Sequence, residues 1–313
     1  MVRELLSRRL QLPVEHIDKI ARSASRRYKT YSVPKRTGGS RIIHHPAKEL
    51  KVLQRWLLHE VINQWPVHPA AHGYEKGKNT RSNALKHVKS AYLLRMDLRD
   101  FFPSLTADDI RQYFAANPND VAEWNTADIE FFVRIVCRTG KLTIGAPTSP
   151  RLSNVLCRHF DTLIADLCDS EGVVYTRYAD DLFFSCGRPN VLRRVEARVL
   201  EVIQHLERPA ELRANTDKTH HSSKKGRRVV TGLRLTQYGK LSSGRPLKRY
   251  VRSMIHRYEG LDIEERQKLA GYLAYLRSVE PTYLNNLVIK FGSQKIRLVT
   301  MARDRGVQET AKR

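Results

Sequence analysis

Apolar residues recur every three or four positions in several stretches of the chain. This spacing gathers apolar side chains on one face of a helix, so it predicts amphipathic helices that pack against a core. Thr106 and Asp109 resemble a capping box at the start of one helix, with Asp where Glu is commoner. Further helices are predicted over residues 14–26, 50–65, 126–138, 149–167 and 192–206.

Apolar, aromatic and β-branched residues also form short runs between turn-forming residues, a pattern typical of strands. Residues 31–46 and 173–185 each predict a β-hairpin, the first around two glycines and the second around a two-residue turn. Further strands are expected over residues 92–97 and 229–235. Strands and helices therefore alternate through the middle of the chain. This order favours an α+β fold in which helices cover one face of an antiparallel sheet.

The tip of the second hairpin carries two adjacent carboxylates, Asp180 and Asp181. Side-by-side carboxylates repel each other, and a divalent cation such as magnesium would remove the repulsion because it prefers oxygen ligands. A solvated turn is the alternative, since aspartate is common in turns. Asp97 ends the predicted strand 92–97 and favours the metal interpretation. Three carboxylates could build a two-metal site for phosphoryl or nucleotidyl transfer.

The composition narrows the choice of partner. The chain has 56 Lys and Arg against 32 Asp and Glu, a formal net charge of +24, and its isoelectric point is near 10.2. This excess favours nucleic acid, because Lys and Arg release counterions from its phosphates. A membrane surface is the competing partner, but the sequence has no apolar run of about 18 residues and no signal peptide. We therefore expect a soluble, intracellular protein without a membrane partner.

The cysteines are widely spaced and form no Cys-x-x-Cys pair: Cys137, Cys157, Cys168 and Cys186. This pattern indicates neither a zinc site nor a disulfide framework. We expect reduced thiols, most of them buried.

Five segments carry motifs in a defined order along the chain. Three are the Asp97 block, Gly145-Ala146-Pro147-Thr148-Ser149-Pro150 and Tyr178-Ala179-Asp180-Asp181. They occur in the order seen in reverse transcriptases. Two more fit elements of retron enzymes, an NAxxH element and a VTG element: Asn83-Ala84-Leu85-Lys86-His87 and Val230-Thr231-Gly232. Over about residues 30–285, the chain resembles a retron reverse transcriptase.

This resemblance implies a right-hand polymerase fold, with fingers, a palm of antiparallel sheet and helices, and a helical thumb. Residues 1–90 would form the N-terminal helix and fingers, with part of the retron-type insertion. Residues 91–236 would form the palm, and residues 237–313 the thumb and C-terminal tail. No RNase H domain is expected after the thumb. Residues 303–313 are polar and are expected to fray.

The resemblance also implies an active site. Asp97 and Asp180 would bridge two Mg²⁺ ions, with Asp181 less important as a direct ligand. Lys218 would lie near the departing pyrophosphate, as a general acid or as a positive charge, unless it is only a surface lysine. Phe102 matches the steric-gate position that selects deoxynucleotides, and a core aromatic residue is the alternative. The other expected nucleotide contacts are Lys35 and Arg41 of the first hairpin and the backbone of Leu98, Arg99, Asp100, Phe101, Gly145 and Ala146.

Ile144 departs from the family pattern, because many reverse transcriptases have Gln before this Gly. The departure removes a polar contact near the nucleotide. Its consequence for nucleotide affinity or fidelity stays open.

RNA recognition is implied for the two retron elements and for a basic helix. Asn83 and His87 could face RNA or act as scaffold, and a helix cap with a surface side chain is the alternative. Basic thumb residues would follow the template-primer backbone, although a basic helix face is often only solvated. The expected RNA contacts are Asn83, His87, Val230, Thr231, Gly232, Lys248, Arg249, Arg252 and Arg257.

The implied activity is that of an RNA-directed DNA polymerase in the bacterial cytoplasm, using deoxynucleoside triphosphates. Retron enzymes copy their cognate structured noncoding RNA from the 2′-hydroxyl of an internal guanosine, leaving branched RNA–DNA (msDNA). A host RNase H would act on the template, and a separate effector protein would join the enzyme in antiphage defence. Another class of reverse transcriptase, a nucleic-acid-binding protein without catalysis and a palm-fold cyclase are the alternatives. The intact carboxylates disfavour a binding protein without catalysis, and the extent of the positive charge disfavours a cyclase.

Overall fold

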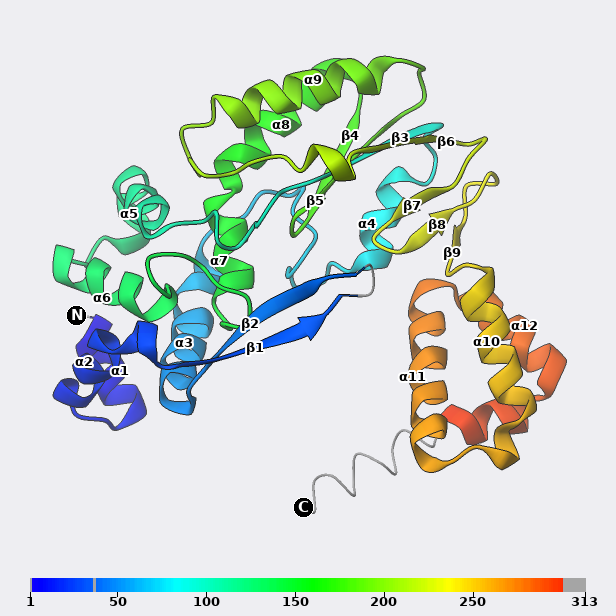
Figure 1. Cartoon of the computed structure of the whole chain (residues 1–313), viewed down its shortest axis with the longest axis horizontal. Coiled ribbons are helices and arrows are strands. Elements are labelled where there is room, and N and C mark those ends of the chain that lie inside the picture. The colour runs from blue at the N-terminus through cyan, green and yellow to red at the C-terminus, as the bar shows by residue number, and fades with distance from the viewer. Residues whose placement is uncertain (1, 36–37, 301–313) are drawn as a thin grey trace. The chain divides into compact units, whose positions relative to one another are not determined.

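The computed structural model describes residues 2–35 and 38–300 (Figure 1). Residues 36–37 of the first predicted hairpin and residues 303–313 of the predicted tail lie outside the described residues. The chain forms two compact units. Unit 1 contains the residues up to Lys78 and Leu94–His221, and unit 2 contains Asn79–Leu93 and the residues from Ser222 onward. The fingers, palm and thumb boundaries expected at residues 90 and 236 stay a prediction.

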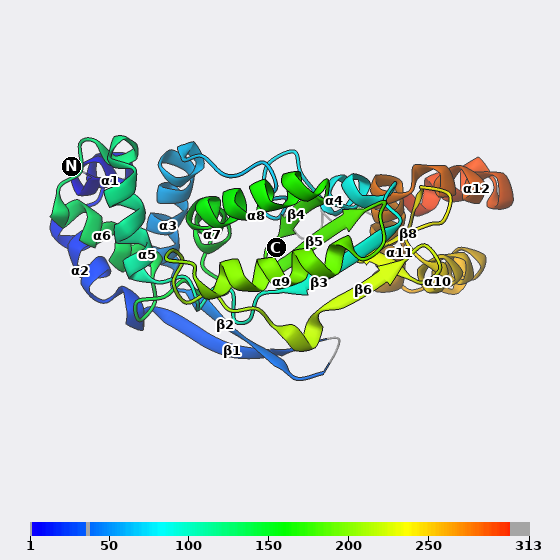
Figure 2. The ribbon, with the colours of Figure 1, turned by 90° about the horizontal axis from the view of Figure 1, so that it is seen from above.

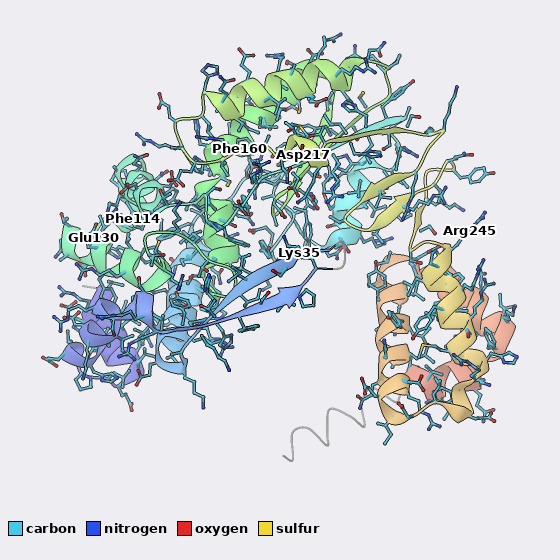
Figure 3. The ribbon with its side chains drawn as sticks, in the orientation of Figure 1. Lys35, Phe114, Glu130, Phe160, Asp217 and Arg245 are labelled. Atoms are coloured by element: carbon cyan, nitrogen blue, oxygen red, sulfur yellow. The ribbon has the colours of Figure 1, made fainter. Side chains whose placement is uncertain are left out.

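Amphipathic helices form much of unit 1, as the apolar spacing predicts. The side chains of Trp65, Phe114 and Phe132 meet at ring-centroid distances of 5.4–5.5 Å in its core; Figure 3 labels Phe114. Such aromatic contacts add about 0.5–1.5 kcal/mol each beyond the area they bury. The helices of this unit are α1 Val2–Leu10, α2 Val14–Arg22, α3 Lys48–Glu60, α5 Ala107–Ala116, α6 Thr126–Val136, α7 Ser149–Leu156, α8 Arg158–Glu171 and α9 Val191–Gln204.

Two of these helices test the sequence analysis directly. The capping box is confirmed, because the Asp109 N–H donates to Thr106 Oγ1 and the Thr106 N–H donates back to Asp109 Oδ2. The single helix predicted over residues 149–167 is wrong in one respect, since it is divided into α7 and α8 at Cys157. Cys157 leaves helical geometry with φ −80° and ψ 3°. The apolar stripe continues through this break and so conceals it.

The first predicted hairpin is present as β1 Tyr28–Pro34 and β2 Ser40–Pro46. The strands pair antiparallel, with Tyr31 opposite Ile43 and Val33 opposite Arg41. Figure 3 labels Lys35 at the free end of this hairpin.

A four-stranded sheet carries the second predicted hairpin. Its order is β4-β5-β3-β6. Helices α8 and α9 pack together, α8 against β4 and α9 against β5, and Figure 2 shows both helices over these strands. The strands are β3 Tyr92–Asp97, β4 Val174–Tyr178, β5 Asp181–Cys186 and β6 His220–Ser223.

Unit 2 combines one helix and a small sheet with a helical subdomain. The strand predicted over residues 229–235 is in fact two antiparallel strands, because Thr231 (φ +45°) and Gly232 (φ +82°) form a tight turn between them. The C-terminal helices share an apolar core that includes Val251, Leu269 and Leu276. The elements are α4 Thr80–His87, β7 Arg228–Val230, β8 Leu233–Leu235, β9 Leu241–Ser242, α10 Arg245–His256, α11 Ile263–Val279 and α12 Pro281–Phe291.

The cysteines are buried, as the sequence analysis expects. All four cysteines are buried and unbridged. Burial raises the pKa of the Cys157 thiol to about 12, so this thiol stays protonated at neutral pH. Across residues 2–35 and 38–300, no helix is both long enough and apolar enough to cross a bilayer.

Candidate active site

The β4–β5 hairpin brings Asp180 next to the end of β3. The strands pair antiparallel and leave Ala179 and Asp180 as the predicted two-residue turn. Ala179 has a left-handed backbone (φ +57°), which suits a tight hairpin turn. The Leu98 N–H donates to the Asp180 carbonyl over 2.9 Å. Because Leu98 follows Asp97 directly, the two carboxylates belong to hydrogen-bonded backbone segments.

Asp97 is 3 % exposed and is hydrogen-bonded from the segment that follows α9. Lys218 Nζ donates to Asp97 Oδ1 over 2.8 Å, and the Asn215 side-chain amide donates to the same oxygen over 3.2 Å. The Lys218 side chain remains 57 % exposed, so it can also reach solvent. The structure thus brings Lys218 to Asp97, and its role near the departing pyrophosphate stays a prediction. Asn215 is missing from the predicted site because it lies 118 positions from Asp97 and gives no local signal.

Asp181 has a different partner from the other two carboxylates. Arg95 donates to Asp181 Oδ1 through Nε over 2.9 Å and through a terminal nitrogen over 2.7 Å. Arg95 is also absent from the predicted site. Its signal in the sequence is a charged residue inside the otherwise apolar strand β3.

The carboxylates carry electrostatic strain that a cation would relieve. Burial, together with the charge of Asp97, raises the pKa of Asp180. Burial raises the pKa of Asp181 to about 6, against the opposing charge of Arg95. Both shifts mean that the site disfavours further negative charge, and a bound cation would reverse them.

The donor set fits a hard divalent cation, because Asp97 and Asp180 supply carboxylate oxygens. Within the described part of the chain, no three side chains of ligand type are grouped closely enough to hold an ion by themselves. Substrate phosphates and water would therefore have to complete the coordination, as is common for magnesium.

A buried ion pair lies behind the turn. Arg177 is fully buried and donates to both Asp161 oxygens, over 2.8 and 2.5 Å. It also donates to Asn154 Oδ1 over 3.0 Å and to the Ala179 carbonyl over 3.3 Å. The Tyr175 hydroxyl donates to Asp161 over 2.8 Å. This network connects α7 and α8 to the turn that carries Asp180.

The segment after Ala70 runs alongside β4 and supports the same turn. The Arg177 N–H donates to the Ala70 carbonyl over 2.8 Å, and the His72 N–H donates to the Arg177 carbonyl over 2.7 Å. A Cβ added at Gly73 would lie 2.8 Å from the Ala179 nitrogen. Any side chain at residue 73 would therefore displace the turn.

The residues that follow β3 differ in their exposure. Leu98 and Phe101 are buried, and Phe101 lies 5.8 Å from the Arg177 guanidinium. Phe102 is half-buried, with its ring centroid 5.4 Å from that of Phe101 and 6.2 Å from that of Tyr74. The remaining two predicted contacts are exposed: Arg99 and Asp100. Phe102 is thus a partly open aromatic residue, as a contact to a sugar requires.

The β1–β2 hairpin contacts the segment that contains Gly145. The His44 N–H donates to the Ile144 carbonyl over 2.8 Å. A Cβ at Gly145 would lie 2.5 Å from the His44 carbonyl oxygen, so glycine is needed for this close approach. Arg41 of this hairpin is exposed, and its charge lowers the pKa of Asp180, although burial outweighs it. Ala146 is buried.

The two retron elements pack together in unit 2. Helix α4, which holds Asn83 and His87, contacts β7, β8 and β9. Thr231 Oγ1 donates to the Thr80 carbonyl at the start of α4 over 2.9 Å. Asn83, His87 and Val230 are fully buried, whereas Gly232 is exposed. Asn83 and His87 are neither a cap nor surface side chains, and this burial supports the scaffold alternative.

The basic residues on α10 and at its C-cap, Arg257, fall into two groups. Lys248 is 20 % exposed, with Nζ 2.5 Å from a Glu280 carboxylate oxygen and 4.6 Å from the Tyr283 ring centroid. The other predicted thumb contacts are exposed: Arg249, Arg252 and Arg257. Lys248 therefore contributes to the packing of the helices, and the exposed arginines are available to a partner.

Comparisons with known proteins agree with this geometry. The family model described as reverse transcriptase (RNA-dependent DNA polymerase) matches residues 33–249. The Retron Ec83 reverse transcriptase of Escherichia coli is 34 % identical over 279 residues, which cover 87 % of this chain and 89 % of that protein. The Retron Ec86 reverse transcriptase of the same organism is 31 % identical over 301 residues, covering 93 % and 91 %.

A solved structure supports the fold. The structure of apo telomerase from Candida tropicalis matches with a TM-score of 0.52 at 12 % identity, covering 90 % of this chain and 63 % of that chain. This likeness, with the mixed helices and antiparallel sheets, confirms the predicted right-hand polymerase fold. Together with the extent of the sequence matches, the arrangement of Asp97, Asp180 and Lys218 leads to one conclusion. The chain belongs to the retron reverse transcriptases and is an RNA-directed DNA polymerase.

Proposed function

We propose that this enzyme makes msDNA by copying its cognate structured noncoding RNA from the 2′-hydroxyl of an internal guanosine. The product would be single-stranded DNA joined to RNA at a branch. The observation that carries the proposal is the packing of the NAxxH helix α4 on the VTG strands β7 and β8, in a chain that matches retron enzymes over most of its length. Two motifs held as one body can recognise the shape of a folded RNA, as is usual for A-form stems.

Catalysis would depend on Asp97, Asp180 and Lys218. Asp97 and Asp180 would hold two Mg²⁺ ions through their carboxylate oxygens. When bound, the ions lower the pKa of the attacking hydroxyl and balance the charge of the triphosphate. Lys218 can turn from Asp97 toward the departing pyrophosphate, because its side chain is exposed. Asp181, held by Arg95, would fix the start of β5 and contribute less as a ligand.

Nucleotide selection would use the β1–β2 hairpin and the aromatic residues after β3. Arg41 would bind the triphosphate in bidentate fashion, with Lys35 as a second positive charge. The Phe102 ring would exclude a 2′-hydroxyl. Phe102→Ala is therefore expected to raise ribonucleotide incorporation, measured as the ratio of kcat/KM for ribonucleotide and deoxynucleotide. An unchanged ratio would leave Phe102 with a packing role only.

RNA and product would bind to the exposed basic residues of unit 2. Arg249, Arg252 and Arg257 can contact phosphates without sequence preference. Buried Asn83 and His87 would shape α4 beneath the RNA-binding surface. A host RNase H would then act on the copied template, and a separate effector protein would link the msDNA to antiphage defence.

The test is to express the gene with its upstream DNA, extract nucleic acid and separate it on a denaturing gel before and after debranching enzyme. Wild type should give a discrete DNA that shifts on debranching. Asp180→Asn should lose it, with synthesis reduced at least about 1000-fold, because the metal ions would lose one of their carboxylate ligands. Asp108→Asn, at an acid whose side chain is 78 % exposed, is the matched control and should behave as wild type.

Two outcomes would overturn parts of the proposal. DNA synthesis only on an added primer, never branched, would leave the polymerase and remove the retron-type priming. Full activity of Asp180→Asn would remove the catalytic assignment. Folding of each variant is checked by circular dichroism, so that loss of product is not loss of structure.

A further inference from the structure

Tyr74 is a residue beside the active site to which neither the sequence analysis nor the proposed function gives a role. It is 46 % exposed, yet its backbone is left-handed, with φ +65°. A large side chain adopts this conformation at a cost of about 1 kcal/mol or more. Such strain is typical of positions where the surrounding structure determines the direction of a side chain.

Both neighbours of Tyr74 are fixed against the catalytic turn. Gly73 packs on the Ala179 nitrogen, and its carbonyl accepts from the Asn154 amide over 2.7 Å. Glu75 accepts from the same amide over 2.7 Å and from Arg151. Because residues 73 and 75 are both held, the backbone of Tyr74 has little freedom to move, and the direction of its Cα–Cβ bond is fixed. Its exposed ring is therefore presented by a rigid frame.

The ring lies beside Phe102, the residue proposed to contact the sugar. Its centroid is 6.2 Å from that of Phe102, and the two planes are tilted by 43°. The charges of Asp180 and Arg41 both act on the Tyr74 phenol. Burial and the charge of Asp180 raise the pKa of this phenol, so it stays protonated and can donate a hydrogen bond.

The sequence gives a reason to expect a hydrogen-bond donor other than residue 144 near the nucleotide. Ile144 stands where many reverse transcriptases have a polar Gln near the nucleotide. Its side chain offers no hydrogen bond, and its carbonyl is already bonded by the His44 N–H. The Ile144 side chain therefore supplies no polar contact to a nucleotide, and the Tyr74 hydroxyl can supply one.

We propose that Tyr74 determines sugar specificity by donating a hydrogen bond from its hydroxyl to the 3′-hydroxyl of the incoming deoxynucleoside triphosphate. The proposal rests on the proposed function, in which Phe102 faces the 2′ position and Arg41 faces the phosphates. Because C3′ adjoins C2′ in the sugar, a hydroxyl on the ring beside Phe102 can reach the 3′ edge. Tyr74 thus recognises the hydroxyl that becomes the next primer end.

The test measures single-nucleotide incorporation on a primed RNA template with full-length wild type, Tyr74→Phe and Tyr238→Phe. The substrates are a deoxynucleotide and the matching 2′,3′-dideoxynucleotide, which lacks the 3′-hydroxyl. Tyr74→Phe keeps the ring and removes only the donor. Its KM for the deoxynucleotide should rise about five- to tenfold, the loss of one neutral hydrogen bond, with kcat within about twofold of wild type. Its KM for the dideoxynucleotide should not change.

The result expected is a fall in discrimination against the dideoxynucleotide by about five- to tenfold in Tyr74→Phe alone. Tyr238, which is 88 % exposed in unit 2, is the control, and Tyr238→Phe should match wild type. Equal KM increases for both substrates, or wild-type discrimination in Tyr74→Phe, would overturn the proposal and leave the polymerase assignment intact. Absence of incorporation by wild type would overturn the proposed function and this inference together.

Discussion

The two largest fully buried side chains are arginines, one in each unit, and their surroundings differ. Arg177 is 0 % exposed and is paired with Asp161, Asn154 and a carbonyl. Arg228 is 1 % exposed, and among residues 2–35 and 38–300 its guanidinium donates to the carbonyls of Ser90 and Thr236 alone. Burial lowers the pKa of Arg228. Burial also acts to lower the pKa of Arg177, but the charge and hydrogen bond of Asp161, with the effects of Cys157 and Tyr175, together outweigh it and the pKa is raised.

The two buried arginines therefore have their charge stabilised in different ways. Arg177 and Asp161 form a neutral pair whose geometry fixes the catalytic turn through the Ala179 carbonyl. Arg228 is a single charge that carbonyl dipoles solvate, and it joins β7 to the chain before β3 and after β8. The first arrangement is sensitive to removal of either partner, because the other charge would stay buried. The second leaves no charge behind when the arginine is removed.

Arg177→Met should have the largest effect on stability. It leaves Asp161 buried without its cation, which typically costs about 3–5 kcal/mol. Urea unfolding followed by fluorescence measures the change in the free energy of unfolding. The double variant Arg177→Met with Asp161→Leu should recover at least half of the loss. A single variant within about 1 kcal/mol of wild type would remove the distinction between the two arginines.

Arg228→Met should cost less, about 2 kcal/mol, because only two hydrogen bonds to carbonyls are lost. The same unfolding experiment on the full chain measures it, with Arg234→Met on the exposed position of β8 as the control. The comparison predicts a smaller loss than for Arg177→Met. An equal or larger loss would show that solvation by carbonyls holds a buried charge as firmly as a carboxylate does.

Asp181 is a third partly or fully buried charge to compare with Arg177 and Arg228. Its partner, Arg95, is partly exposed. The pKa of Asp181 is about 6 in the folded protein against an ordinary value of 3.8, so the folded state binds the proton more tightly. Stability without divalent cations should therefore fall as pH rises from about 4 to 6. Asp181→Asn should make this fall shallower, since the raised pKa of Asp180 contributes in the same direction, and should be more stable than wild type by about 1 kcal/mol above pH 6 and equal to it near pH 3.5.

Thermal unfolding in a chelating buffer measures this pH dependence. Asp217→Asn, at an acid whose side chain is 86 % exposed, is the control and should follow wild type at every pH. A wild-type stability that rises with pH in this range would contradict the raised pKa. It would also mean that Arg95 outweighs the effect of burial on Asp181, as the partners of Arg177 do for that arginine.

The sequence predicts local features of this molecule well and long-range pairings poorly. The hairpin turn at Asp180 and the capping box at Thr106 depend on neighbouring residues, and both are confirmed. The break at Cys157 is missed because the apolar stripe runs through it. The contacts of Asn215 and Arg95 are missed because they depend on the strand order β4-β5-β3-β6, which residue spacing does not specify.

The candidate site follows the same rule. Asp97 and Asp180 are predicted together because one ends a predicted strand and the other lies at a predicted hairpin tip, and because three blocks match a known order. The strained backbone of Tyr74 depends on Gly73 and Glu75 meeting distant parts of unit 1, so no pattern near residue 74 indicates it. The basic residues of α10 look equivalent in the sequence, whereas the structure divides them by their partners.

Substitutions of Lys248 and Arg252 should have the smallest effects. They compare a paired and an unpaired basic residue on the same helix, α10. Lys248 is bonded to Glu280, whereas Arg252 is exposed and makes no ion pair within residues 2–35 and 38–300. Lys248→Ala should lower stability by less than about 1 kcal/mol and leave RNA affinity unchanged. Arg252→Ala should leave stability unchanged and weaken RNA binding about threefold.

The salt dependence of RNA binding separates these two effects. Loss of one phosphate contact should reduce the slope of log affinity against log salt concentration by about 1 in Arg252→Ala. The slope should stay at the wild-type value in Lys248→Ala, because its charge is already balanced by Glu280. A reduced slope for Lys248→Ala would mean that RNA displaces Glu280 from the lysine. A paired charge would then serve binding as well as folding, and pairing in the free protein would no longer indicate which charges contact RNA.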